Sequence, residues 1–583
     1  MEDVLKAEVA SAVQRATGCT IEAELEHPAE LAHGDWASSV ALALAKEVGE
    51  APRALAERIV AELGEIEGVA TIEVAGPGFI NLHLDRAFFT RMTDEVRERG
   101  RAWGRNERLK GQTWVIEHTS PNPNKAMHIG HLRNNVTGMA LVRLSEACGA
   151  HVIADAVDNN RGIAIAKLMW GYLRFAHVRN EADHDLAYWF LHQDEWHTPE
   201  SAGQPPDRFV DELYVKGSRD CEADPAAEAA VRQLVVAWEA GEEKTWALWE
   251  RVLSYSHDGQ ARTLARLGSR WDRVWHEHEH YQKGKDLVET GLAHGVFKRL
   301  PDGAILTNLE AYGIPDTIVE KNDGTSLYIT QDLALTKLKK ETYEADCLIW
   351  VVGPDQSLAM RQVFAVCEQL DIGSLDEFVH VAYGYMSIKG AGKMSSRKGN
   401  VLYIDEVIDA TREASLAVLA ERDLPEKAQL AETIALGAIK YAILRSGRMR
   451  DIAFDQEAAT QLEGDTGPYL QYAATRARSV LRNAAGAGVG ARTDAPPGAV
   501  NEVERLLYRF PEVVDRAQRE LEPHHVAQFL LTLAGAFNSW YAAEQIVAPE
   551  ERTSPYRVAL TEAFLITMEN GLGLLGIDAP ERM

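Results

Sequence analysis

Residues 113–135 read TWVIEHTSPNPNKAMHIGHLRNN, and this stretch decides the fold. Its first five residues form a short apolar run, which predicts a buried strand. The loop from His118 to Lys125 holds two prolines in close spacing, so it cannot be regular structure. Apolar side chains then recur at helical spacing from about Ile129 to Ala147. Strand, polar loop and helix together predict a βα unit with a site at the carboxyl end of the strand.

The residues on either side of this stretch predict an α/β protein with a Rossmann-like parallel-sheet domain. Further strands are expected at 152–154, 347–352 and 378–382, and a helical insertion at about 165–300. Before this domain lies a small α/β unit, and after it the pattern is almost entirely helical. We place the three domains at 1–108, 109–425 and 426–583.

The composition excludes several classes of protein. The 583 residues carry a net charge of −27 and are 46% hydrophobic, which is typical of a globular chain and not of a disordered one or a general nucleic-acid coat. No run approaches 18 apolar residues, so we expect no membrane partner. The amino terminus lacks the apolar core of a signal peptide. The five cysteines form no CxxC pair, which argues against structural zinc or disulfides and favours the cytoplasm.

Two segments carry candidate chemistry. In His128-Ile-Gly-His131 the imidazoles and the free N–H groups of a helix start can donate to phosphate oxygens, and Gly130 leaves room for a flat base. A structural histidine pair or a metal site would explain the same residues. The second segment, residues 389–399, is glycine-rich and carries +4 between Lys389 and Lys398, as expected of a loop that stabilises a polyphosphate. A solvated surface turn is the alternative.

Taken together, the two segments resemble the HIGH and KMSKS elements of class I aminoacyl-tRNA synthetases. The wider pattern resembles the arginyl-tRNA synthetases over nearly the whole chain and is weakest at 175–270. The stretches that carry the resemblance are 115–135, 158–162, 323–332, 384–399, 467–472 and 570–583.

The resemblance implies ATP-dependent activation of L-arginine to arginyl-adenylate. It also implies transfer of the arginyl group to the 2′-OH of the 3′-terminal ribose of tRNA(Arg), with the tRNA bound before activation. Mg²⁺ would accompany ATP. We expect a monomer without a resident metal. The implied roles are catalysis by His128, His131, Lys125 and Lys393; ATP binding by His128, Gly130, His131, Lys393, Ser395 and Ser396; and arginine binding by Glu117, Ser120, Asn122, Tyr328, Asp332 and Gln356.

The arginine site also has a physical rationale. A guanidinium group needs carboxylates and carbonyls in a fork geometry, and Glu117 and Asp332 are the matching acids. Tyr328 lies one helical turn before Asp332, so both can face one pocket. Each residue also has an ordinary explanation: a surface ion pair for Glu117, core packing for Tyr328 and a helix cap for Asp332.

Three positions depart from the family pattern. Ser396 replaces the second lysine of KMSKS, and Lys125, just before the HIGH element, is placed to supply the missing charge. Ala359 stands where many relatives carry histidine, so no base or donor is expected there. Arg161 lies in an NNRG stretch where other members carry a DWG-like sequence, so we transfer no contacts across that loop.

Two tRNA-contacting regions are implied as well. Phe79 and Asn81 match positions that stack on and hydrogen-bond a flipped-out base of the tRNA D-loop. In the helical region, which resembles an anticodon-binding domain, the candidates are Tyr469, Tyr472, Arg476 and Trp540. From 472 to 493 there are four arginines and no acid. Core packing is the alternative for Phe79 and Trp540.

Other readings remain open. The run His276-Glu-His-Glu-His280 would place alternate histidines on one face of a strand, as in a metal site, but its surroundings resemble a helical segment of the family in which only Glu277 recurs. A class I synthetase for another amino acid is one rival, and the acids Glu117 and Asp332 argue against apolar or acidic substrates. A catalytically silent tRNA-binding paralogue is the other, against which the intact His128, His131 and Lys393 argue.

Overall fold

The computed structural model describes residues 1–28, 30–179, 185–322, 327–389, 401–420 and 424–583. The chain forms two compact units, and each is described by itself. The first consists of Met1–Gly104, Ala473–Glu512 and Leu531–Asn570. The second consists of Arg105–Tyr472, Val513–Leu530 and Gly571–Met583. The three domain boundaries expected from the sequence stay a prediction.

The second unit is built on a five-stranded parallel sheet. Its strands are β4 (Thr113–Glu117), β5 (His151–Asp158), β6 (Arg273–His276), β10 (Cys347–Val351) and β11 (Phe378–Val381). They are ordered β11-β10-β4-β5-β6, and every neighbouring pair is parallel. The chain starts in the middle at β4 and winds outward to both edges, so the strand order reverses between β4 and β10. Ligands of open α/β sheets bind at the carboxyl ends of the strands beside such a reversal.

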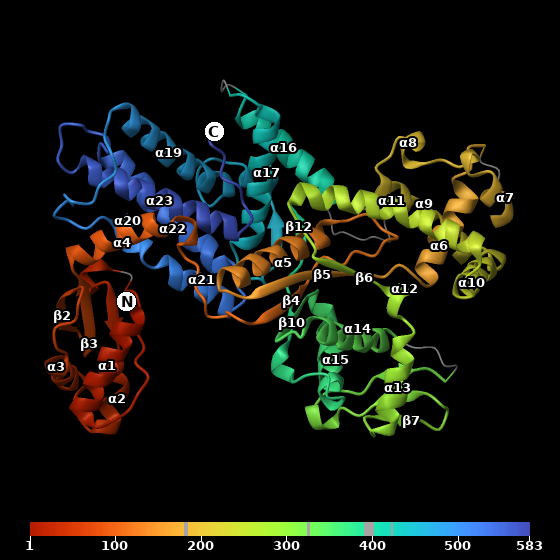
Figure 1. Cartoon of the computed structure of the whole chain (residues 1–583), viewed down its shortest axis with the longest axis horizontal. Helices are drawn as coiled ribbons and strands as arrows, with labels where there is room; N and C mark the ends of the chain where they lie inside the picture. The colour runs from red at the N-terminus through yellow and green to blue at the C-terminus, as the bar shows by residue number, and fades with distance from the viewer. Residues whose placement is uncertain (29, 180–184, 323–326, 390–400, 421–423) are drawn as a thin grey trace. The chain divides into compact units, whose positions relative to one another are not determined.

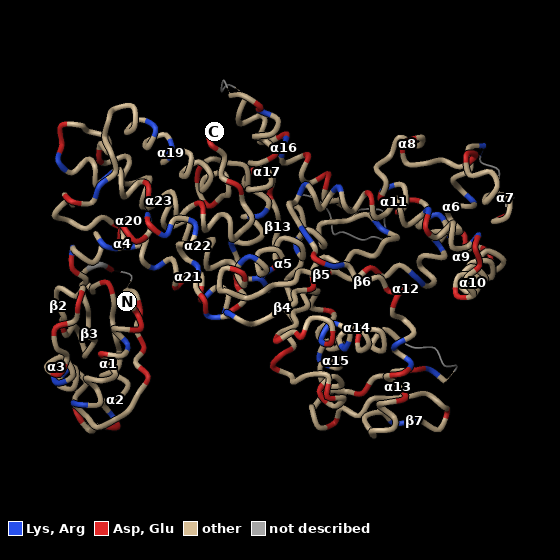
Figure 2. The backbone as a smooth tube through the Cα atoms, viewed as in Figure 1, with Lys and Arg blue, Asp and Glu red and all other residues tan. Residues whose placement is uncertain are grey.

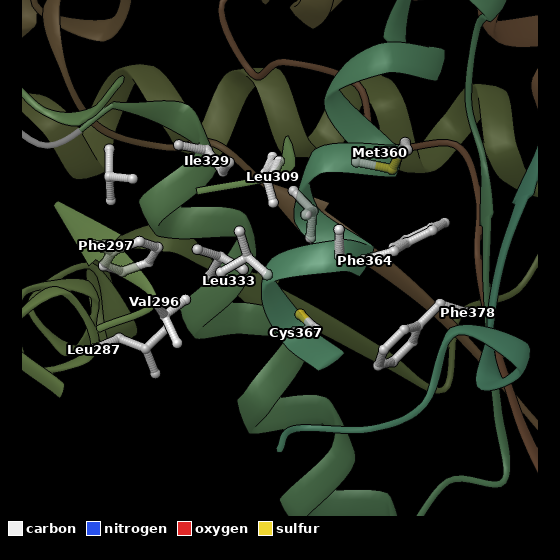
Figure 3. Close-up of a cluster of buried hydrophobic side chains, with 14 of the residues drawn as sticks. Leu287, Val296, Phe297, Leu309, Ile329, Leu333, Met360, Phe364, Cys367 and Phe378 are labelled. Atoms are coloured by element: carbon white, nitrogen blue, oxygen red, sulfur yellow. The ribbon is translucent and has the colours of Figure 1, made fainter. Parts of the chain in front are cut away.

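Alternate residues of the strands pack on opposite faces of this sheet. Val115, Leu348 and Trp350 join a core cluster with Leu333 and Phe364. Figure 3 shows Leu333 and Phe364 in this cluster. The helices on that face are α13 (Lys283–Ala293), α14 (Tyr328–Tyr343) and α15 (Ser357–Gln369). The other face carries α5 (Ile129–Ala147), which contacts β4, β5 and β10 (Figure 1). The predicted Rossmann-like sheet is therefore confirmed, with helices on both faces.

The expected helical insertion is shorter than its predicted range. Its helices run from α6 (Ile163–Phe175) through α9 (Pro206–Ala223) and α10 (Pro225–Glu239) to α11 (Glu243–Leu267). They share a core rich in aromatic side chains, among them Trp189 and Trp249. The chain then enters β6, an edge strand of the central sheet that the sequence did not predict. Residues 297–320 add a small antiparallel sheet, β7-β8-β9, made of Phe297–Arg299, Ile305–Thr307 and Ile318–Glu320.

The first unit combines the amino-terminal α/β fold with helices from the carboxyl-terminal part. Its antiparallel sheet has the order β1-β3-β2, and β1 was missed because its three residues precede a helical pattern directly. The amino-terminal elements are α1 (Glu2–Thr17), β1 (Trp36–Ser38), α2 (Val40–Val48), α3 (Pro52–Glu62), β2 (Val69–Ala75), β3 (Phe79–Leu84) and α4 (Arg86–Arg99).

From Asp405 onward the described chain is helical apart from the short strand β13, as predicted. The elements used below are β12 (Met386–Ile388), α16 (Ile404–Val418), α17 (Lys427–Leu444), β13 (Ile452–Phe454), α19 (Gly467–Gly486), α20 (Glu502–Leu507), α21 (Phe510–Arg519), α22 (His524–Ala543) and α23 (Ser554–Leu574). Among the described helices, none combines the length and hydropathy needed to cross a bilayer.

Candidate active site

The helix after the first sheet strand begins with the predicted histidine pair. His128 is the N-cap of α5, and its Nδ1 accepts a hydrogen bond from Gly130 N–H at 3.1 Å. The Nδ1 of His131 accepts from His128 N–H, also at 3.1 Å. The two rings lie 4.1 Å apart between centroids. The histidines thus cap the helix with their inner nitrogens, which leaves the Nε2 atoms to carry the protons and act as donors.

Both imidazoles are held neutral. Burial lowers the pKa of His128, and the nearby charge of Lys125 lowers it further. Burial lowers the pKa of His131 to about 3, with smaller contributions from His128 and Lys125. Lys125 is half-buried, with its ammonium 5.8 Å from the centre of the Tyr214 ring. The positive charge of Lys125 therefore lies close to the histidine pair, as its predicted role requires.

Gly130 faces the ring that caps it. A Cβ atom at this position would stand 3.0 Å from Cε1 and 3.1 Å from Nδ1 of His128. Any larger residue would push the His128 ring away from the helix start. The glycine therefore keeps the His128 ring at the helix start. The N–H groups of residues 129–131 are bonded within the protein, so the free backbone donors expected from the sequence are taken, and the helix dipole and the Nε2 donors of the two histidines are what favour an anion there.

The chain beyond the glycine-rich loop returns to this helix start. Ile129 N–H donates to the carbonyl of Leu402 at 3.1 Å, and Ile404 N–H donates to the carbonyl of Met127 at 3.1 Å. Before the loop, Lys389 binds Asp455 at 2.7 Å. Lys393, Ser395 and Ser396 lie outside the described residues. These backbone hydrogen bonds place Leu402 and Ile404, which follow the loop in the chain, beside the start of α5.

Buried acids gather at the carboxyl ends of β4 and β5. Glu117, 8% exposed, accepts from Lys339 Nζ at 2.8 Å and from Ser120 Oγ at 3.3 Å. Lys339 also donates to Asp155 at 3.0 Å, and Asp155 accepts from Trp275 Nε1 at 2.9 Å. Lys339, Asp155 and Trp275 were not predicted. The available signals were an acid in the interior of the apolar strand VIADAVD and a lysine two helical turns after Asp332.

Asp332 lies close to these acids. Its pKa is raised to about 7, mainly by burial and then by the charge of Glu117, with a smaller contribution from Glu277 and an opposing one from Lys339. Burial also raises the pKa of Glu277, which pairs with Arg161 at 3.5 Å. Acids on α14, β4 and the start of α12 (Glu277–His280) thus feel one another's charge. This arrangement favours a cationic ligand.

The other residues predicted to bind arginine differ in burial and in their contacts. Ser120 Oγ touches Glu117 and accepts from Val157 N–H at 3.0 Å. The exposed Asn122 accepts from Asn159 Nδ2 at 3.2 Å. Gln356 follows β10, is exposed and donates to Asp355 at 2.8 Å. The Tyr328 side chain, at the start of α14, is 90% exposed, so it does not share the buried surroundings of Asp332.

Three neighbouring polar residues of α5 hold the segments around the carboxyl ends of β4 and β10 through hydrogen bonds. The sequence analysis did not predict them. Asn134 accepts from Thr119 N–H at 2.8 Å and donates to the carbonyl of Val351 at 2.6 Å. Asn135 donates to Thr119 Oγ1 at 3.2 Å. Arg133, 1% exposed, donates to the carbonyls of Tyr385, Arg448 and Arg450. Thr119 has a φ of 52°, a conformation that a β-branched residue keeps only where its surroundings hold it.

The histidine run does not form a metal site in the part of the chain described. His276 ends β6 and binds Asp158 at 2.7 Å, while His278, in α12, pairs with Asn160 at 2.9 Å. Asp158 also pairs with His257 at 3.1 Å. The change from strand to helix after His276 removes the shared face that alternate histidines on a strand would have. The described residues hold no group of three or more His, Cys, Asp or Glu suited to a metal ion.

The predicted tRNA contacts lie on β3, α19 and α22. Phe79 and Asn81 share the face of β3 opposite the core residues Ile80 and Leu82; Phe79 is half-buried, and Asn81 is 3% exposed. Tyr469, Tyr472 and Arg476 are partly exposed on α19, and the Arg476 guanidinium lies 5.0 Å from the Tyr541 ring centre. Trp540 is 6% exposed and packs against Phe537, whereas Tyr541 is 43% exposed.

The fold and the histidine-capped helix at its sheet reversal define a class I tRNA synthetase. The catalytic domain described as "tRNA synthetases class I (R)" matches residues 98–162 and 186–456. The arginyl-tRNA synthetase N-terminal domain matches 3–84, and the DALR anticodon-binding domain matches 470–583. The chain belongs to the arginyl-tRNA synthetase family.

Individual relatives agree with this family. The arginine–tRNA ligase of Treponema denticola is 31% identical, over 96% of this chain and 94% of its own length. That of Porphyromonas gingivalis is 30% identical, over 89% of each chain. The arginyl-tRNA synthetase of Thermus thermophilus superposes with a TM-score of 0.80 at 26% identity, covering both chains fully. The Plasmodium falciparum enzyme, 16% identical with a TM-score of 0.82 over 99% of this chain and 98% of its own, shares the fold.

Proposed function

We propose that this chain joins L-arginine to tRNA(Arg) in two steps at the carboxyl edge of the β4–β10 sheet. The arginine carboxylate attacks the α-phosphorus of ATP, which forms arginyl-adenylate and releases pyrophosphate. The 2′-OH of the tRNA's terminal ribose then attacks the arginyl carbonyl and releases AMP. The observation that carries the proposal is a cluster of four acids, Glu117, Asp155, Asp332 and Glu277, that holds only two cations, Lys339 and Arg161, in the same unit as the histidine-capped start of α5.

The phosphate side of the reaction is assigned to the start of α5. His128 and His131 are neutral donors through Nε2–H, and Gly130 admits the adenine base and the phosphates. Lys125 and Lys393 stabilise the charge that builds up on the α-phosphate and the leaving pyrophosphate, and Ser395 and Ser396 take part in ATP binding. Lys125 takes over from the lysine that Ser396 replaces. Preorganised donors of this kind act only where the charge develops, so they lower the barrier without tightening substrate binding equally.

The arginine side is assigned to the acids. Glu117 and Asp332 bind the cationic groups of the substrate, and Ser120, Asn122, Tyr328 and Gln356 complete the site. Mg²⁺ enters with ATP and is held mainly by phosphate oxygens. No step depends on a protein-bound metal.

The partners and location follow from the same assignment. Phe79 and Asn81 contact the D-loop of the tRNA, and Tyr469, Tyr472, Arg476 and Trp540 contact its anticodon stem and loop. Figure 2 shows acidic and basic residues interspersed along the chain, so the net charge of −27 does not preclude local basic surfaces. We propose a cytoplasmic monomer. Its five cysteines are free, which suits a reducing compartment.

The test is ATP–pyrophosphate exchange with each amino acid, with and without tRNA(Arg). We expect exchange with arginine and only when the tRNA is present. Exchange with a different amino acid would overturn the substrate assignment. Binding of tRNA(Arg) with no exchange under any condition would instead identify a silent tRNA-binding paralogue.

A further inference from the structure

A fully buried lysine stands between two acids of the central sheet. Lys339 is 1% exposed, and its Nζ lies 2.8 Å from Glu117 Oε2 and 3.0 Å from Asp155. Asp155 is completely buried and is also held by Trp275 Nε1. Glu117 and Asp155 are register partners on β4 and β5, so their side chains leave the sheet on the same side. One ammonium therefore bridges two neighbouring like charges.

Stability alone does not explain this triad. A buried lysine and two buried acids lose their hydration on folding, and their mutual attraction often only offsets that loss. Replacing such triads with apolar residues of similar volume is often neutral or even stabilising. The triad is, moreover, not self-contained, because one of its acids, Glu117, also raises the pKa of Asp332.

The triad ties helix α14 to the sheet. Lys339 and Asp332 are two turns apart on α14 and so lie on the same face, separated by about 10 Å along the helix axis. Lys339 anchors the far end of this face to β4 and β5. The position of Asp332 relative to Glu117 is then set by a rigid helix and one ionic contact. An extended cation can contact Glu117 at one end and Asp332 at the other only if the distance between these two acids is fixed.

We propose that Lys339 is a positioning residue of the arginine site. It holds one oxygen of Glu117 and fixes the distance between Glu117 and Asp332, so that the two acids together fit arginine. This inference rests on the proposed arginine pocket. Lys339 Nζ donates a hydrogen bond to Oε2 of Glu117, and Ser120 Oγ donates one to Oε1. Each carboxylate oxygen can accept about two hydrogen bonds. The carboxylate therefore keeps a defined direction and still has acceptor capacity for the substrate.

The test separates positioning from folding by using a charge-balanced variant. Lys339→Met alone leaves Glu117 and Asp155 facing each other without a counter-charge, which strongly destabilises the fold. The double variant Lys339→Met/Asp155→Asn removes one charge of each sign and keeps an acceptor for Trp275. We expect it to raise the KM for arginine at least tenfold in tRNA-dependent ATP–pyrophosphate exchange. The KM for ATP should stay within twofold, with rates referred to the folded, adenylate-forming fraction.

The control is Lys340→Met on the same helix. Lys340 donates to Glu377 at 2.9 Å and to the Ala345 carbonyl at 2.6 Å, and neither partner belongs to the site. It should leave both KM values within twofold. A double variant that folds and keeps its arginine KM within twofold of the parent, or that raises both KM values equally, would overturn the positioning role.

Glu117→Gln distinguishes failure of this inference from failure of the proposed pocket. If Glu117→Gln leaves the arginine KM unchanged, the pocket assignment fails and the role of Lys339 fails with it. If Glu117→Gln raises the arginine KM while Lys339→Met/Asp155→Asn does not, the pocket stands and only the inference about Lys339 is overturned.

Discussion

The molecule buries two clusters of charge that are built in opposite ways. In the first unit, Asp35 binds Arg505, and Glu504 binds Arg86 and the Tyr556 hydroxyl. In the second unit, Lys339 is the cation bound by Glu117 and Asp155, and Asp332 adds further acid. The first cluster has as many bases as acids, and the second has a surplus of acids.

The first cluster, which has equal numbers of acids and bases, stabilises the fold. Asp35 is 1% exposed, and its second oxygen accepts Leu84 N–H at 2.8 Å. Glu504 is 2% exposed and accepts Arg86 Nη1 at 2.9 Å and Asn501 N–H at 2.8 Å. Both carboxylates are thus fully engaged by protein donors. Nothing in this cluster is left for a ligand to neutralise.

The acid-rich cluster has the opposite property. Its lone buried lysine faces three acids, Glu117, Asp155 and Asp332. Burial, followed by the charge of Glu117, raises the pKa of Asp332. A protein gains no stability from such an excess, and a bound cation would neutralise it, as the proposed arginine site requires. The comparison suggests a rule that mutations can test: acids in the first cluster support folding, whereas Asp332 supports binding at the expense of folding.

The largest effect should come from removing Asp332. Asp332→Ala deletes the acid proposed to accept the guanidinium and would leave that group unpaired, so we expect a loss of about 1000-fold in kcat/KM for arginine. The loss is measured in ATP–pyrophosphate exchange with tRNA(Arg), while equilibrium dialysis follows ATP binding, which should persist. Glu341→Ala, exposed on the same helix, is the control. Unchanged arginine kinetics in the Asp332 variant would remove Asp332 from the pocket.

The next effect concerns the first cluster. Glu504→Gln leaves Arg86 without its buried counter-charge and should lower the free energy of unfolding by about 2–4 kcal/mol. Urea unfolding followed by circular dichroism measures the change, with exposed Glu502→Gln on the same helix for comparison. The arginine KM should stay unchanged. A shift in that KM without loss of stability would mean that the two clusters are not functionally distinct.

A smaller effect is expected from pH. Asp332 has a raised pKa of about 7 in the free protein, so it is mostly protonated below that value and cannot pair with a guanidinium. The kcat/KM for arginine should therefore fall as the pH drops below 7, by up to about tenfold per unit, because this parameter reports the free enzyme. The kcat/KM for ATP at saturating arginine should lack this break. A flat arginine profile from pH 5.5 to 8 would contradict the assignment.

Sequence alone predicted what depends on local pattern. The strand at 113–117 and the helix from Ile129 were confirmed because apolar spacing and the proline loop determine them directly. Strand β6 was missed because only four residues at the sheet edge carry it, between a long helix and the histidine run. Lys339 was missed for a different reason: a lysine on a helix is ordinarily solvated, and only tertiary packing of α14 against β4 and β5 buries it.

The exposure of Tyr328 illustrates the same limit at the site itself. Spacing on α14 indicated that Tyr328 and Asp332 face one pocket, yet Tyr328 begins the helix and its side chain is 90% exposed, whereas Asp332 is surrounded by protein. Helical spacing tells which side of a helix a residue occupies, but not how far the neighbouring structure extends along it. For that reason the acids could be named from sequence, while the surroundings that set their charge could not.

The smallest effect is also the sharpest test of the comparison, because its sign is opposite to that of Glu504→Gln. The folded protein binds a proton at Asp332 up to a pKa of about 7, against an ordinary value of 3.8. Between these values the folded state holds the proton more tightly than the unfolded chain, so stability falls as pH rises from about 4 to about 7. Asp332→Asn cannot ionise, and it should therefore stabilise the free protein at pH 8 by on the order of 1–3 kcal/mol and leave its stability at pH 4 unchanged. Urea midpoints at the two pH values measure the difference. Loss of stability at pH 8 would show that Asp332, like Glu504, serves the fold, and the distinction between the two clusters would then be lost.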